Sequence, residues 1–99
     1  MRTISTVIKI GDTKASKYGS GTITTIHCED LITREPRFAY VKHRINSRRS
    51  GLMNIFQPGN AVVGNLRENS HGKLNVIDTD RSNPQIATPM DIEEYITGN

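Results

Sequence analysis

Residues 37 to 45 alternate strictly between two kinds of side chain, which predicts a β-strand with two different faces. Successive side chains of a strand point to opposite sides of its sheet. The face typical of a protein core holds Ala39, Val41, His43 and Ile45. The other face holds Phe38, Tyr40, Lys42 and Arg44. Two aromatic rings followed by two cations are the combination with which a sheet stacks bases and holds phosphates.

Four further segments carry strand patterns, rich in Ile, Val and Thr: residues 3–10, 22–28, 61–66 and 73–78. Residues 11–21 contain Gly, Ser and Lys and are expected to form an exposed connection or a hairpin. The apolar cluster at 52–56 favours a short helical turn between the third and fourth strands. Gly64, inside a strand, predicts a bulge or a tight bend.

A chain of 99 residues predicts one domain with a small core. Five short strands favour a closed barrel, because closure removes the edges that would otherwise pair with other chains. We therefore expect an all-β fold, a five-stranded OB-type barrel over residues 1–78 with one short helix. Residues 79–99 are expected to form an extended arm, with a short helix near 90–96.

Charge is unevenly distributed along the chain. The 13 Lys and Arg exceed the 10 Asp and Glu by only three, which by itself weakly favours a polyanionic partner. Nine of these cations lie between Lys9 and Arg49, where there are only four acids. The central part of the chain is therefore the expected contact for phosphates.

Other residues extend this expected contact. Arg48 and Arg49 fall in a predicted loop, where guanidinium groups can hold phosphates or can simply be solvated. Tyr18, close to Lys17, is either a second stacking residue or an ordinary exposed tyrosine. Arg67 and Lys73 border the last predicted hairpin and could lengthen the basic track.

Residues 51–78 resemble the corresponding part of bacterial and phage single-stranded DNA-binding proteins. The matching features are an apolar helix at 52–56, the turn Pro58-Gly59-Asn60, the strand at 61–67 and a last strand at 74–77. The chain departs from that family in having no Trp, a short hairpin at 68–72 and only a brief acidic patch at 91–96. The resemblance implies that the chain has an OB fold and is a reduced, viral or accessory relative of this family. It also implies a role in DNA replication, recombination or repair.

Catalysis and metal binding are not expected. His27 and Cys28 are adjacent, so on a strand they point apart. One Cys and three scattered His show no metal-ligand spacing. We expect no enzyme, no cofactor, no metal and no small-molecule substrate.

The single Cys28 cannot form an internal disulfide, and no run of about 18 apolar residues is present. These features predict a protein of the cytoplasm, in a prokaryotic or virus-infected cell, with no membrane contact. The expected ligand is single-stranded nucleic acid, DNA rather than RNA, bound by a homodimer or homotetramer. The alternatives are a structural or protein-interaction barrel, such as a viral assembly component or adaptor, and an RNA-binding OB module.

Overall fold

The computed structural model describes residues 2–15, 21–43, 51–68 and 74–98. Its elements, in chain order, are β1 (Arg2–Ala15), β2 (Thr22–Asp30), β3 (Pro36–His43), α1 (Gly51–Ile55), β4 (Ala61–Glu68), β5 (Leu74–Ile77), β6 (Gln85–Ile86) and α2 (Pro89–Thr97). The mostly β character, the five strands β1 to β5 and the helix between the third and fourth of them agree with the expectations from the sequence.

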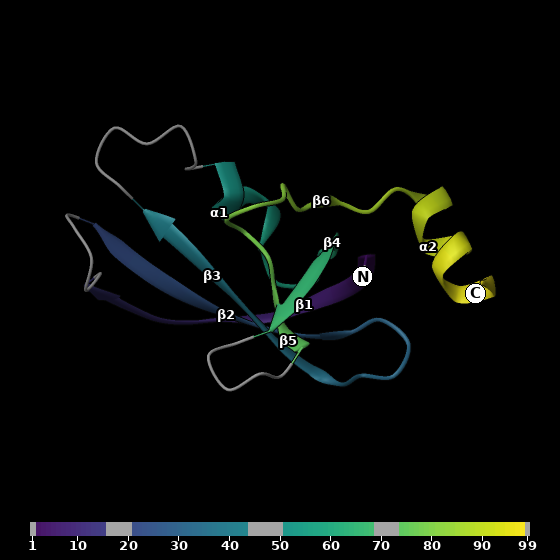
Figure 1. Cartoon of the computed structure of the whole chain (residues 1–99), viewed down its shortest axis with the longest axis horizontal. Coiled ribbons are helices and arrows are strands. Elements are labelled where there is room, and N and C mark those ends of the chain that lie inside the picture. The colour runs from purple at the N-terminus through teal and green to yellow at the C-terminus, as the bar shows by residue number, and fades with distance from the viewer. Residues whose placement is uncertain (1, 16–20, 44–50, 69–73, 99) are drawn as a thin grey trace.

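Five strands pair in a ring. The sheet order is β1-β2-β3-β5-β4-β6, and β1 also pairs with β4, so that the first five strands close on themselves. All pairings are antiparallel except that of β3 with β5, which is parallel. Figure 1 shows β1 and β2 extending together to one end of the molecule, with α2 at the opposite end.

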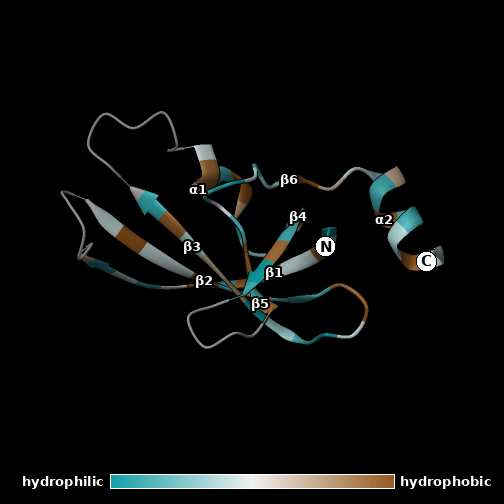
Figure 2. Cartoon of the chain, in the orientation of Figure 1, coloured by the Kyte–Doolittle hydropathy of each residue, from teal (hydrophilic) through white to brown (hydrophobic). Residues whose placement is uncertain are grey.

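The inside of the ring is filled mainly by β-branched side chains from alternate strand positions. One cluster joins Val7, Ile26, Cys28, Ala39, Val41, Phe56, Val62 and Ile77. Phe56 follows α1 and is fully buried, as its place in an apolar cluster predicts. Hydrophobic and hydrophilic segments alternate along β2 and β3 in Figure 2, as expected for strands with one buried face.

β1 is longer than its sequence pattern predicts. It continues through Gly11 to Ala15 and pairs there with the start of β2, so residues 11–15 belong to the expected hairpin and not to an exposed connection. The strand keeps its pairing with β2 through register shifts between Val7 and Lys9 and between Ile10 and Thr13. Such irregularities interrupt the simple alternation from which strands are predicted.

Gly64 does not mark a bulge. The β1–β4 ladder passes it without a register shift. A Cβ atom at this position would lie 3.1 Å from Ile77 Cγ2 and 3.6 Å from Pro84 Cβ. The glycine therefore permits close packing of β5 and of the segment after it.

The chain turns at residues 79–82 and then forms an extended arm over residues 83–88, but this arm is attached to the ring. Ile86 pairs with Val62, and the Ala87 amide donates to the Ala61 carbonyl at 2.9 Å. The arm leads to α2, which starts with a capping box between Thr88 and Asp91. The predicted helix near 90–96 is thus present, whereas β6 was not expected.

A buried polar network connects α2 to the ring. Arg37 Nη1 lies 2.8 Å from Asp30 Oδ1 and donates to Ser5 Oγ at 3.1 Å. The Tyr95 hydroxyl donates to the same Asp30 oxygen at 2.5 Å, and Asp30 Oδ2 accepts from the amide of Thr33 at 2.8 Å. Burial raises the pKa of Asp30, but these hydrogen bonds and the Arg37 charge together lower it to about 2.

Within the described ranges, no helix is long and apolar enough to cross a membrane.

Candidate nucleic-acid interface

The two faces of β3 differ as its alternation predicts. Ala39 and Val41 are fully buried in the core. Phe38, Tyr40 and Lys42 occupy the alternate positions and are half-buried. The predicted stacking residues therefore lie on the outer face of the ring.

Cross-strand pairing places a row of side chains across this outer face. Its members, from β1 through β2, β3 and β5 to β4, are Lys9, His27, Phe38, Val76 and Arg67. Directly paired residues share one face of a sheet. The row therefore carries a cation at each end, two rings near one end and a buried valine between Phe38 and Arg67.

The outer face of β2 and β3 carries an aromatic surface made of His27, Phe38 and Tyr40, and His27 and Phe38 form its centre. Their ring centroids are 5.3 Å apart, and the ring planes meet at 69°. This edge-to-face arrangement is one of the favourable geometries for π systems. The imidazole fixes one side of the Phe38 ring and adds a second flat surface to the face.

Gly11 provides the space for the His27 ring. A Cβ atom at position 11 would lie 2.7 Å from His27 Nε2 and 2.9 Å from the Thr25 carbonyl oxygen. Real Cβ atoms do not approach other atoms so closely, so only glycine allows the imidazole this position above β1.

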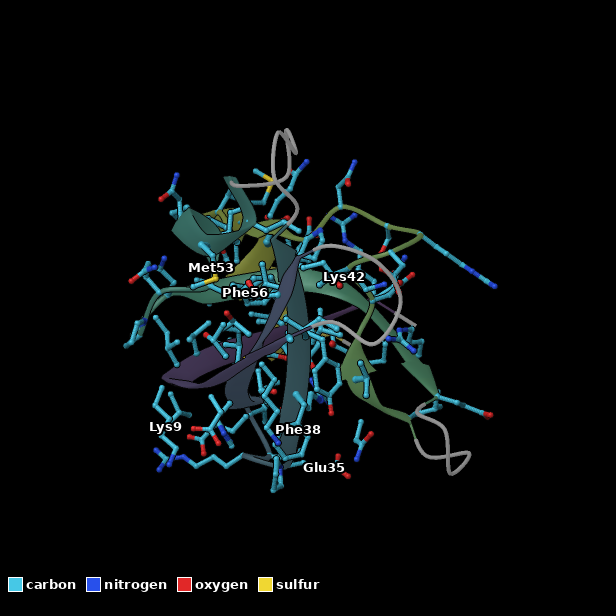
Figure 3. All side chains as sticks on the ribbon, turned by 90° about the vertical axis from the view of Figure 1, so that its left-hand side faces the viewer. Lys9, Glu35, Phe38, Lys42, Met53 and Phe56 are labelled. Carbon is cyan, nitrogen blue, oxygen red and sulfur yellow. The ribbon has the colours of Figure 1, made fainter. Side chains whose placement is uncertain are left out.

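A second row lies near the other end of β3 and carries two lysines. Ile23 of β2 pairs with Lys14 of β1 on one side and with Lys42 of β3 on the other. Thr25 and Tyr40 pair between this row and the row of Phe38. Figure 3 shows Phe38 toward the lower end of β3, Lys42 toward its upper end and Lys9 at the lower left. Cations thus lie at both ends of the aromatic surface.

Acidic residues from the segment after β5 neutralise part of this charge. Lys42 Nζ is 3.0 Å from Asp80 Oδ1, and Arg67 Nη2 is 3.9 Å from Asp80 Oδ2. Arg67 Nε is also 3.9 Å from Asp78 Oδ1. Two predicted phosphate contacts therefore already face carboxylates.

Asp78 organises the turn that carries Asp80. Its Oδ1 atom accepts from the amides of Asp80 and Arg81, both at 3.0 Å. Burial raises the pKa of Asp78, but these hydrogen bonds, the Arg67 charge and the Ser82 hydroxyl lower it below its usual value. Thr79 Oγ1 donates to the Tyr40 carbonyl at 2.8 Å, which holds the turn against β3.

The structure brings four of the predicted contact residues onto this face: Phe38, Tyr40, Lys42 and Arg67. The other six lie outside the described residues: Lys17, Tyr18, Arg44, Arg48, Arg49 and Lys73. Their contribution to the interface stays a prediction.

His27 was not predicted as a contact, whereas Lys9 and Lys14 were expected only as members of the basic central part of the chain. The alternation of β2, with Ile26 and Cys28 buried, would have placed His27 outside. Its position opposite Phe38 depends on the register, which the sequence does not specify.

The thiol of Cys28 is buried in the core. Burial raises its pKa to about 12, against the lowering influence of the Arg37 charge. A protonated, enclosed thiol is a poor nucleophile. In the part of the chain that the structure describes, no three His, Cys, Asp or Glu side chains are grouped as metal ligands.

Comparisons with protein families, with curated proteins and with solved structures found no match to this chain. The resemblance of residues 51–78 to single-stranded DNA-binding proteins therefore remains a prediction from the sequence.

Proposed function

We propose that this chain is an OB-type barrel that binds single-stranded DNA with little sequence preference, in replication, recombination or repair. The observation that carries the proposal is the outer face of β2 and β3. There, His27, Phe38 and Tyr40 are flanked by lysines from β1 and β3.

The connectivity of the ring supports the proposed barrel type. Its order is β1-β2-β3-β5-β4, closed by the β1–β4 pairing, and α1 lies in the connection between β3 and β4. OB folds are five-stranded Greek-key barrels that bind oligonucleotides on the face of strands 2 and 3. The candidate interface lies on that face.

The chemistry of the face also suits this ligand. Stacking on an aromatic side chain contributes about 1 to 3 kcal/mol per base and tolerates any sequence, because every base has a π face. Lysines beside the rings supply contacts to phosphates, which make binding weaker as salt increases. In OB folds the loops from strand 1 to 2 and from strand 4 to 5 assist binding, and Lys17, Tyr18 and Lys73 occupy those connections in the sequence.

A binding comparison tests the proposal. Fluorescence anisotropy would give the affinity for labelled oligo-dT, the matching RNA and a duplex at several salt concentrations. We expect tightest binding to the DNA single strand and a fall in affinity with salt. Equal or tighter binding of RNA would favour the RNA-binding alternative, and no binding at low salt would exclude both.

The pairing of Lys42 and Arg67 with Asp80 favours a second candidate function, a structural or adaptor barrel whose aromatic face contacts protein. A face with compensated charge and half-buried rings is suited to a protein surface. Failure to bind any of the three nucleic acids would favour this alternative.

The expected homodimer or homotetramer is part of the same proposal, because one small barrel offers a short track for a single strand. Light scattering coupled to size exclusion measures the mass of the assembly directly. A monomer at micromolar concentration would remove this part of the proposal and leave the binding face unaffected.

A further inference from the structure

The carboxylate of Asp80 lies between two cations of the candidate interface. Its two oxygens face different partners, Oδ1 toward Lys42 Nζ at 3.0 Å and Oδ2 toward Arg67 Nη2 at 3.9 Å. We propose that Lys42 and Arg67 form one site for a backbone phosphate, and that Asp80 occupies this site in the free protein. This inference rests on the proposed function, because its ligand is the phosphodiester of the bound strand.

The arrangement of the two cations suits a phosphodiester. Such a group presents two unesterified oxygens that share one negative charge, as a carboxylate does. Lys42 supplies a compact charge, and Arg67 supplies a planar fork that can bind two oxygens together. One phosphate can therefore replace the Asp80 carboxylate between the same partners.

The two aspartates do not satisfy the hydrogen-bond donors of Arg67. Its distances of 3.9 Å to Asp78 and Asp80 exceed the roughly 3.2 Å limit of a good hydrogen bond. Its Nε atom is buried and makes no hydrogen bond with the described residues. A ligand cannot reach this buried atom, but the Arg67 side chain is 40% exposed, so an anion can approach the rest of the guanidinium more closely than the aspartates do.

The Asp80 side chain can leave without disrupting the turn. The turn is held by Asp78, which accepts from the backbone amides of Asp80 and Arg81, and by the bond from Thr79 to Tyr40. The Asp80 carboxylate takes no part in those contacts. It is 38% exposed and its partner Lys42 is 41% exposed, and ion pairs so accessible to water are weak.

The Asp80 carboxylate therefore competes with a backbone phosphate for this site, and this competition lowers the affinity of the protein for single strands. Asp80→Asn removes the negative charge but keeps the backbone amide and the size of the side chain. We expect it to bind labelled oligo-dT of about 15 nucleotides roughly threefold to tenfold more tightly than the unmodified chain at low salt. The matched control is Glu93→Gln, which makes the same charge change on α2 at the far end of the molecule (Figure 1) and is expected to alter affinity by less than about twofold.

Repeating Asp80→Asn in a chain that already carries another substitution separates an effect on this site from the general effect of net charge. In a chain carrying Lys42→Gln, the gain from Asp80→Asn should shrink to about the size of the control effect, because half of the site is missing. Retention of the full gain in that background would overturn the proposal. Thermal unfolding of each variant checks that the fold is intact.

The outcomes distinguish this inference from the proposed function. Binding by the unmodified chain with no gain from Asp80→Asn would overturn the inference and leave the function standing. Binding by the Asp80→Asn variant alone would support both. No binding by either chain would overturn both.

Discussion

Phe38 on β3 and His27 on β2 lie directly opposite each other, with ring centroids 5.3 Å apart and ring planes at 69°. The edge of one ring therefore meets the face of the other, and their positions are fixed by the ladder of the two strands. A preorganised aromatic surface loses little conformational entropy when a base stacks on it. The pair is thus the expected centre of the binding face.

Replacing Phe38 by leucine should weaken binding to single strands by about tenfold, near the lower end of the range for losing one stacked base. Leucine preserves apolar packing over Val76 but has no π face. Anisotropy with labelled oligo-dT measures the change, and Ile96→Ala, an exposed apolar residue of α2, is the control. Unchanged affinity in a folded Phe38→Leu variant would show that Phe38 does not stack a base.

The close contact of Gly11 with His27 predicts a cost for any side chain at position 11. A Cβ atom there would lie 2.7 Å from His27 Nε2 and 2.9 Å from the Thr25 carbonyl oxygen. Gly11→Ala should therefore lower the free energy of unfolding by about 1 to 3 kcal/mol, as measured by urea denaturation. It should also weaken single-strand binding, because the imidazole must move.

Gly51→Ala is the matched control for that substitution. A Cβ atom at Gly51 meets nothing within 4 Å, and alanine is favoured over glycine in a helix by about 1 kcal/mol. This variant should be as stable as the unmodified chain or more stable. Equal destabilisation by both variants would argue against a specific contact at Gly11.

The Asp30 network predicts a loss of stability in acid. The pKa of Asp30 is about 2 in the folded state, below its ordinary value of 3.8. Its contribution, about 2 kcal/mol, is therefore fully present above pH 4 to 5 and is lost as the pH falls toward 2. Urea denaturation at a series of pH values measures this dependence.

Asp30→Asn identifies the source of that dependence. It leaves the buried Arg37 without its charged partner, which should lower the free energy of unfolding at pH 7 by about 3 to 5 kcal/mol. The remaining stability should fall less steeply in acid than that of the unmodified chain. The exposed Asp12→Asn is the control, with an expected change within about 0.5 kcal/mol; an acid dependence unaltered by Asp30→Asn would assign it to other carboxylates.

Cys28 should be unreactive in the folded protein. Burial raises its pKa from 9.0 to about 12, so ionisation alone reduces the thiolate about a thousandfold at pH 8. An aromatic disulfide reagent should label the thiol fully in denaturant and at least about a thousandfold more slowly without it. Comparable rates in the two conditions would place Cys28 at the surface.

Much of the ring could be predicted from the sequence, because a period of two residues is a direct consequence of strand geometry. β3 is the clearest case, since Ala39 and Val41 are buried and Phe38 and Tyr40 are not fully so. The burial of Phe56 could also be predicted, because its neighbours in the sequence are apolar. These features depend on local pattern alone.

The remaining features of the fold and of the site depend on pairing between segments that are far apart in the sequence. Lys9 faces His27 only because β1 shifts its register after Val7, and no local pattern specifies that shift. β6 is two residues long and forms where the arm meets β4. Asp80 reaches Lys42 because the chain after β5 continues along β3, a parallel relationship that tertiary packing decides.

Nuclear magnetic resonance of the ¹⁵N-labelled chain during titration with oligo-dT locates the binding face directly. We expect the largest amide shifts at Lys9, His27, Phe38, Tyr40 and Lys42 on the paired strands, and none at Glu93 and Ile96 on α2. Shifts confined to α2 and β6, or no shifts at low salt, would contradict the binding of single strands by the outer face of β2 and β3.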